Sequence, residues 1–169
     1  GHLSLVGAES HFPYDRPPLS KAVLAGTREP ASIALTRPKT WEALELDLHL
    51  GVRAEALDLS DRTVQLGDGN RLPYDGLIIA TGASPRTIPG TPDLPGIYTL
   101  RTLDDCLAIR AELERGPKVA VVGAGFIGAE VAATCRERGL DVAVIETFET
   151  PLANALPPAI GDLCGDIHR

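Results

Sequence analysis

Apolar and polar residues alternate at 3–6, which is the spacing of a β-strand with one buried face, and the chain between about 46 and 80 also has a strand-like pattern. Short strands are predicted at 3–6, 52–57 and 63–66, with a hairpin turn at 67–70, where the sequence reads Gly-Asp-Gly-Asn. Residues 77–80 are apolar at every position, which is typical of a strand buried on both faces.

The second half alternates between strand-like and helix-like segments. A loop rich in Gly, Pro, Ser and Thr at 81–95 is the predicted linker. Two further helices are expected, one at 21–25 and one after the prolines at 157–158. The remaining predicted elements are a helix at 103–115, a buried strand at 119–122, a helix at 126–138 and a strand at 141–145. This order predicts an α/β fold with parallel strands in at least the second half.

A glycine-rich turn joins the strand at 119–122 to the helix after it. Gly123, Gly125 and Gly128 form the pattern G-x-G-x-x-G. In such turns the first glycine makes the tight bend, the second lets the backbone approach a pyrophosphate, and the third lets the helix pack against the strand. The helix that opens at Phe126 and Ile127 offers unpaired N–H groups to the phosphates. The pattern predicts a dinucleotide site, although a tight turn without a ligand has the same glycines.

Glu146 ends the next predicted strand, 18 residues after Gly128. A carboxylate at this place accepts hydrogen bonds from the ribose hydroxyls of a dinucleotide. Because it repels a 2′-phosphate, the site is expected to prefer NADH to NADPH.

The composition of the chain argues against several classes of protein. The net charge of −7 and the pI near 5 argue against a nucleic-acid partner, and no apolar run has the length of a membrane span. Without a basic and then apolar leader, a cytoplasmic protein is predicted. The three cysteines and four histidines are scattered, so no metal site is expected, and no C-x-x-C motif points to a redox disulfide.

Several segments match a known family in order and spacing. They are Pro-Tyr-Asp-Arg-Pro-Pro-Leu-Ser-Lys at 13–21, Ala-Thr-Gly-Ala at 80–83, Tyr-Thr-Leu-Arg-Thr at 98–102, and the glycine-rich turn to Glu130. The chain resembles, over nearly its whole length, the FAD-dependent, NADH-using ferredoxin, rubredoxin and putidaredoxin reductases. These form the non-disulfide branch of the pyridine nucleotide-disulfide oxidoreductases.

The resemblance implies roles for residues toward FAD. Glu9 would hold the adenosine ribose, Arg16 would lie along the adenosine and diphosphate, and Ala54 would meet the adenine through its backbone. Thr81 and Gly82 would line the crossing between the two nucleotide domains. Arg101 is also expected to contact the flavin cofactor.

Two residues are implied to act at the reacting rings. Lys21 would reach the isoalloxazine ring, where a cation stabilises the negative charge that develops on reduction. Glu130 would face the nicotinamide and pair with Lys21, so that hydride donor and acceptor are held face to face. Without the resemblance, Arg16 and Lys21 could be solvated charges, and Glu130 could be an acid favoured by the helix dipole.

The resemblance also implies domains and an activity. The expected fold holds two Rossmann-like units, both incomplete: a partial FAD-binding domain at 1–100, with a small antiparallel β segment, and a partial NAD-binding domain at 101–169. The family's first glycine-rich loop has no counterpart here, so we expect a fragment, truncated at both ends and inactive alone.

The whole protein would pass electrons from NADH through FAD to a ferredoxin- or rubredoxin-type protein. A homodimer is a possible oligomeric state. Alternatives are a non-catalytic NAD-binding or interaction module, or the flavoprotein part of a nitrite reductase or an NADH oxidase-like enzyme.

Overall fold

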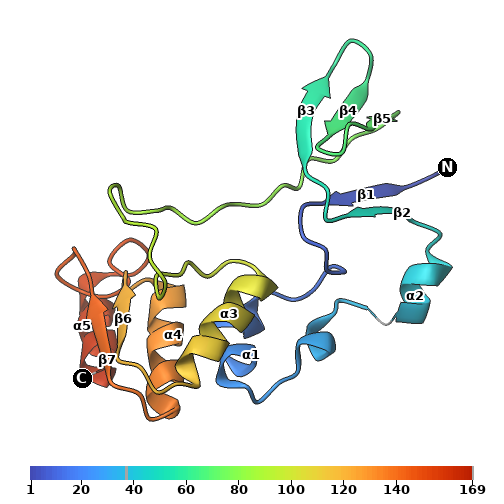
Figure 1. Ribbon diagram of the computed structural model, residues 1–169. Coiled ribbons are helices and arrows are strands. Elements are labelled where there is room, and N and C mark those ends of the chain that lie inside the picture. The colour runs from blue at the N-terminus through green and yellow to red at the C-terminus, as the bar shows by residue number, and fades with distance from the viewer. Residues whose placement is uncertain (37, 169) are drawn as a thin grey trace. The chain divides into compact units, whose positions relative to one another are not determined.

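The chain is a mixed α/β protein with parallel and antiparallel sheets. The structure, a computed structural model, describes residues 1–36 and 38–168. Figure 1 shows two compact units, each built from two stretches of chain. The first unit is Gly1–Asp15 with Ile33–Ser84, and the second is Arg16–Ser32 with Pro85–Arg169. The division into cofactor domains at residue 100 is a statement about ligands and stays a prediction.

The first unit holds two small sheets and a short helix. A parallel pair is formed by β1 (Ser4–Gly7) and β2 (Asp47–Leu50), with α2 (Pro38–Ala43) before β2. The second sheet is antiparallel, in the order β3 (Ala54–Asp58), β4 (Thr63–Leu66) and β5 (Arg71–Pro73). The predicted hairpin turn is confirmed between β4 and β5, where the Asp68 carboxylate accepts the backbone N–H of Asn70 at 3.0 Å.

The predicted buried strand at 77–80 is wrong. These residues form no strand, and Ile78 and Ile79 are 89% and 70% exposed. A strand exists only where a neighbour completes its hydrogen-bond ladder, and no described residue pairs with this run. Apolar composition alone therefore marks a segment that prefers burial, without supplying the partner that would bury it.

The second unit carries the predicted alternation of helices and strands. β6 (Val119–Val122) and β7 (Val142–Ile145) pair in parallel, with Val119 opposite Val142 and Val122 opposite Ile145. The helices are α1 (Ala22–Ala25), α3 (Leu103–Leu113), α4 (Phe126–Glu137) and α5 (Pro158–Ile167), with 3₁₀ turns at Pro17–Ser20 and Pro30–Ile33.

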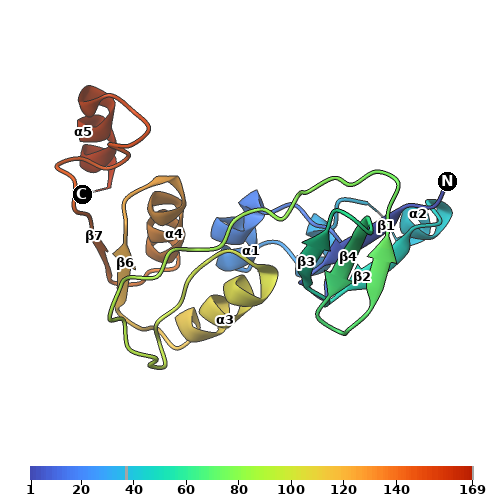
Figure 2. The same cartoon turned by 90° about the horizontal axis from the view of Figure 1, so that it is seen from above.

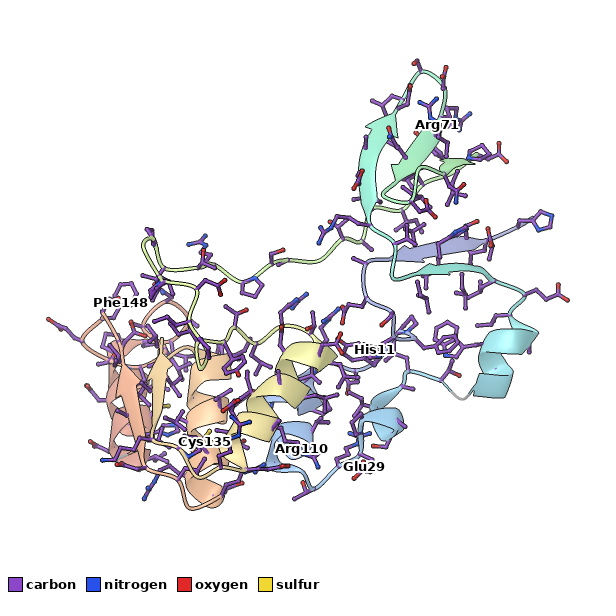
Figure 3. The ribbon with its side chains drawn as sticks, viewed as in Figure 1. His11, Glu29, Arg71, Arg110, Cys135 and Phe148 are labelled. Atoms are coloured by element: carbon purple, nitrogen blue, oxygen red, sulfur yellow. The ribbon has the colours of Figure 1, made fainter. Side chains whose placement is uncertain are left out.

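Local chemistry explains why α3 and α1 begin and end where they do. Thr102 caps α3: its side chain accepts the N–H of Asp105, and the Asp105 carboxylate accepts the N–H of Thr102 at 2.8 Å. Gly26 ends α1 with φ of +81°, a conformation that costs glycine little. A Cβ added at this glycine would lie 3.4 Å from the guanidinium of Arg110 in α3; Figure 3 labels Arg110.

The core of the second unit lies between its helices. In both views α4 lies between α1 and the β6–β7 pair (Figures 1 and 2). The buried side chains of this core include Leu19, Val23, Leu24, Cys106, Leu113, Ala132 and Cys135. A buried strand is predicted at 119–122, but Val122 is 61% exposed. Only alternate residues of a strand face α4, so the other face of β6 stays open.

Candidate functional site

The glycine-rich turn between β6 and α4 is the centre of the candidate site. Gly123 has φ of +102°, and its N–H donates to the Ile145 carbonyl at 2.8 Å, which ties the bend to the end of β7. A Cβ on Gly128 would lie 1.9 Å from the Gly123 carbonyl oxygen. No side chain fits there, so the helix approaches the strand closely only because residue 128 is glycine. The predicted mechanical roles of these two glycines are confirmed.

Gly125 differs from Gly128 because it borders open space. A Cβ on Gly125 would meet no atom within 4 Å, and its φ of −73° is open to any residue. Neither packing nor backbone strain therefore requires glycine at this position. The next two side chains, Phe126 and Ile127, are 56% and 55% exposed at the start of α4. The first N–H groups of the helix thus begin beside a surface that a ligand can reach.

Glu146 lies at the rim of this turn, as the sequence predicts. One carboxylate oxygen accepts the N–H of Ala124 at 2.6 Å, and the other accepts those of Thr147 at 2.7 Å and Phe148 at 3.1 Å. These bonds, that from Ala124 first, hold the pKa of Glu146 below its usual range. The group is therefore a carboxylate at neutral pH, and the oxygen that meets Ala124 keeps a lone pair for another donor.

The loop after β7 folds back onto the same turn. The Leu152 N–H donates to the Ala124 carbonyl at 2.9 Å, so both backbone groups of Ala124 are held. Leu152 is 9% exposed, whereas Phe148 in the same loop is 51% exposed (Figure 3). The turn is thus fixed from β7 and from this loop before any ligand binds.

Lys21 and Glu130 meet directly. The Lys21 ammonium lies 2.7 Å from Oε2 of Glu130, with the two side chains 49% and 33% exposed. Partial burial acts to raise the pKa of Glu130, but hydrogen bonds from Lys21 and Ser20 outweigh it and hold that pKa below its ordinary value. The predicted pairing of these two residues is present in the second unit.

The segment that carries Lys21 is fastened to α3 and α4. The Arg16 guanidinium donates to the Arg101 carbonyl at 2.8 Å, and the Arg138 guanidinium donates to the Leu24 carbonyl at 2.9 Å. The Cys106 thiol donates to the Leu19 carbonyl at 3.1 Å. Burial raises the pKa of this thiol to about 11, so it is a structural group and not a nucleophile.

The remaining predicted residues lie in the first unit. Glu9 follows β1, its carboxylate accepts a hydrogen bond from the Tyr14 hydroxyl, and its carbonyl accepts the Gly51 N–H at 2.9 Å. Ala54 begins β3 and is exposed, and Thr81 and Gly82 lie in the exposed segment that follows β5. The roles proposed for all these residues concern ligands and stay predictions.

Two hydrogen-bond donors at the site are not predicted by the sequence patterns. Ser20 donates to Glu130 at 2.6 Å, and the backbone N–H of Ala124 donates to Glu146. Ser20 stands beside Lys21 within a recognised motif, so its position was the available signal. No residue type identifies the N–H of Ala124, because every residue except proline has one.

Two kinds of site are not found in the described part of the chain. No three His, Cys, Asp or Glu side chains there gather as ligands for a metal ion. Within the same residues, each helix is too short or too polar to cross a lipid bilayer.

Comparison with known proteins gives matches along the entire chain. The family profile described as pyridine nucleotide-disulphide oxidoreductase matches residues 1–169. The ferredoxin–NAD(+) reductase component of the anthranilate 1,2-dioxygenase system from Burkholderia cepacia is 41% identical over 168 residues, which are 98% of this chain and 41% of that protein.

Solved structures agree with the fold. The ferredoxin reductase for the CYP199A2 system from Rhodopseudomonas palustris is 36% identical with a TM-score of 0.93, covering 99% of this chain and 42% of that one. A covalent putidaredoxin reductase–putidaredoxin complex is 33% identical with a TM-score of 0.91, covering 100% of this chain and 42% of that one. The chain thus spans about two fifths of the length of the relatives it matches.

Proposed function

Because the chain belongs to the pyridine nucleotide-disulphide oxidoreductase family, we propose that it is the nucleotide-binding part of a reductase that passes electrons from NADH through FAD to a ferredoxin-type iron–sulfur protein. The observation that carries the proposal is the glycine turn in the second unit, which is open at Gly125 and has the Glu146 carboxylate at its rim. The names of the relatives support the choice of acceptor and of NADH.

The residues of the turn fit a dinucleotide. The pyrophosphate would lie over Gly125, where no atom competes for the space, and would meet the N–H groups at the start of α4. The Glu146 carboxylate would accept hydrogen bonds from the adenosine ribose. Since the pKa of Glu146 is lowered, the group keeps its negative charge at neutral pH and opposes a 2′-phosphate. These features favour NADH over NADPH.

We propose that the chain carries two incomplete Rossmann-like nucleotide-binding domains, at 1–100 and 101–169. We assign the adenosine and crossing contacts of FAD to Glu9, Arg16, Ala54, Thr81, Gly82 and Arg101. When bound, FAD supplies the step from a two-electron donor to a one-electron acceptor.

Lys21 and Glu130 are the pair that we place at the reacting rings. Lys21 carries a positive charge that would stabilise negative charge on the flavin, and its bond to Glu130 keeps the ammonium in place. Glu130 would face the nicotinamide of bound NADH. The pair thus holds a positive charge at a defined place. Because both side chains stay partly exposed, a ligand can still reach them.

The sharpest test of nucleotide binding uses a substitution that the fold tolerates. Gly125→Ala is expected to stay folded, because the new Cβ meets no protein atom, and to lose only the small stability that alanine costs at a helix N-cap. It should weaken NADH binding by about tenfold or more in a calorimetric titration, since the methyl group occupies the path of the pyrophosphate.

Gly76→Ala is the matched control, because residue 76 also has open space around its Cβ and lies in the first unit. It should change neither unfolding nor NADH affinity. Equal NADH affinity in the unmodified chain and in folded Gly125→Ala would refute the assignment of the turn.

A second test separates a flavoprotein from a simple NAD-binding module, which has no need of Lys21 and Arg16. In a flavoprotein, Lys21→Met and Arg16→Met should weaken the binding of added FAD.

A further inference from the structure

Ser20 makes a short hydrogen bond to the proposed catalytic carboxylate. It is 5% exposed, and its Oγ lies 2.6 Å from Oε2 of Glu130 and 3.3 Å from the Pro17 carbonyl oxygen. A hydroxyl has one proton to donate, and the charged acceptor at the shorter distance takes it. Ser20 is therefore a donor to Glu130.

Ser20 is itself held by the helix that carries Glu130. The Thr134 hydroxyl, one turn later on α4, donates to the Ser20 carbonyl at 2.9 Å, and Thr134 is 5% exposed. The side chain of Ser20 thus donates to α4 while its backbone accepts from α4. One buried bond and one partly buried bond between the same two segments leave the Ser20 hydroxyl little freedom to turn away from Glu130.

The two donors to Glu130 differ in rigidity. The Lys21 ammonium reaches the same oxygen, Oε2, at 2.7 Å, but the Lys21 side chain is 49% exposed and flexible. An exposed ion pair fixes geometry weakly, because salt screens it and the long side chain resists ordering. Among the described residues no donor reaches Oε1, so this second oxygen is left for a ligand.

We propose that Ser20 is a positioning residue for Glu130, whose hydroxyl holds Oε2 in place beside Lys21 and thereby presents Oε1 to the nicotinamide. The hydrogen bond stands on the structure alone, while the role toward the nicotinamide rests on the proposed function. Replacing Ser20 by alanine removes one hydroxyl and leaves Glu130, Lys21 and the glycine turn unchanged in sequence.

The test follows the Glu130 carboxyl carbon by NMR during an acid titration of the whole chain, without nucleotide. In Ser20→Ala the titration midpoint should move to higher pH, because the charged form loses a donor. Ser20→Thr should restore the midpoint. Ser32→Ala, which removes an exposed serine hydroxyl of the same segment that donates to the Glu29 carbonyl, should leave it unchanged.

An unchanged midpoint in folded Ser20→Ala would overturn the proposal. If this variant does not fold, the unmodified chain decides: the Ser20 hydroxyl proton signal should move as Glu130 takes up its proton, and a signal that ignores this titration refutes the bond. A second measurement addresses the ligand. NADH affinity of Ser20→Ala should fall about 3- to 10-fold, the effect of one hydrogen bond.

The two proposals can fail separately. If the unmodified chain does not bind NADH, the proposed function and the role of Oε1 fall together, while the carboxyl titration still decides whether Ser20 holds Glu130. If NADH binds equally well to the unmodified chain and to Ser20→Ala, the positioning role is refuted and the proposed function stands.

Discussion

Single atoms decide what the glycine turn can do. At Gly128 an added Cβ would collide with the Gly123 carbonyl, whereas at Gly125 it would meet open space. Packing therefore explains why residue 128 is glycine. For Gly125 a bound ligand is the one reason that remains. Both roles could be predicted from the sequence, because the G-x-G-x-x-G pattern, the strand before it and the helix after it are all local features.

Ser20 shows where prediction from sequence stops at this scale. The family resemblance, which rests in part on the motif at 13–21, predicts the pairing of Lys21 with Glu130. The bond from Ser20 to Glu130 joins residues 110 positions apart. It depends on how α4 packs against the 3₁₀ turn, and no spacing rule along the chain contains that information.

Glu146 gives the turn a defined pH dependence. Its hydrogen bonds, first from Ala124, lower the pKa of the folded state, so their stabilisation is fully present above the ordinary carboxyl pKa. It is lost as the pH falls through the lowered value. The Ala124 amide resonance should therefore titrate with a midpoint below the ordinary pKa of a glutamate, and Glu146→Gln should abolish this transition. A midpoint at or above the ordinary value would contradict the bond.

At the scale of elements, segments whose ends carry local signals matched the prediction, and a segment that needed a distant partner did not. α3 and α4 begin at the predicted residues, because capping and turn residues mark helix ends locally. The run at 77–80 has strong strand character but no partner among the described residues. A strand depends on a second segment that the local sequence does not name, which is why this prediction failed.

The cap of α3 offers a quantitative check on an element. Thr102→Ala removes the side-chain acceptor for the Asp105 N–H and should lower the free energy of unfolding by about 1 kcal/mol in urea. Thr91→Ala removes an exposed loop hydroxyl that donates to the Ile88 carbonyl but caps no helix, and should alter this free energy by less than about 0.5 kcal/mol. Equal losses in the two variants would mean that the cap contributes nothing specific.

At the scale of the whole molecule, the chain interleaves its two compact units. Residues 16–32 belong with 85–169, although the first half of the chain surrounds them in sequence. The composition of the loop at 81–95 predicts a linker, and the longer stretch of the second unit begins within it, at Pro85. The placement of 16–32 had no such signal, since it follows from long-range contacts of Arg16, Leu19, Ser20, Lys21 and Leu24.

Exposed apolar surface should govern how the purified chain behaves. Ile78 and Ile79 are adjacent and largely exposed, and such patches drive association in water. We expect concentration-dependent oligomers in light scattering after size exclusion, and fewer of them in the double variant Ile78→Ser, Ile79→Ser. Leu59→Ser is the control, because Leu59 is a single apolar residue, 74% exposed, in the turn between β3 and β4. A strictly monomeric unmodified chain would refute this expectation.

The central claim is that the turn between β6 and α4 binds a pyridine nucleotide, and amide NMR tests it directly. On addition of NADH, the largest chemical-shift changes should fall on residues 123–128 and on Glu146, and NADPH at the same concentration should produce smaller ones. Shifts that are absent at saturating NADH, or that centre in the first unit and spare Ala124, would contradict it.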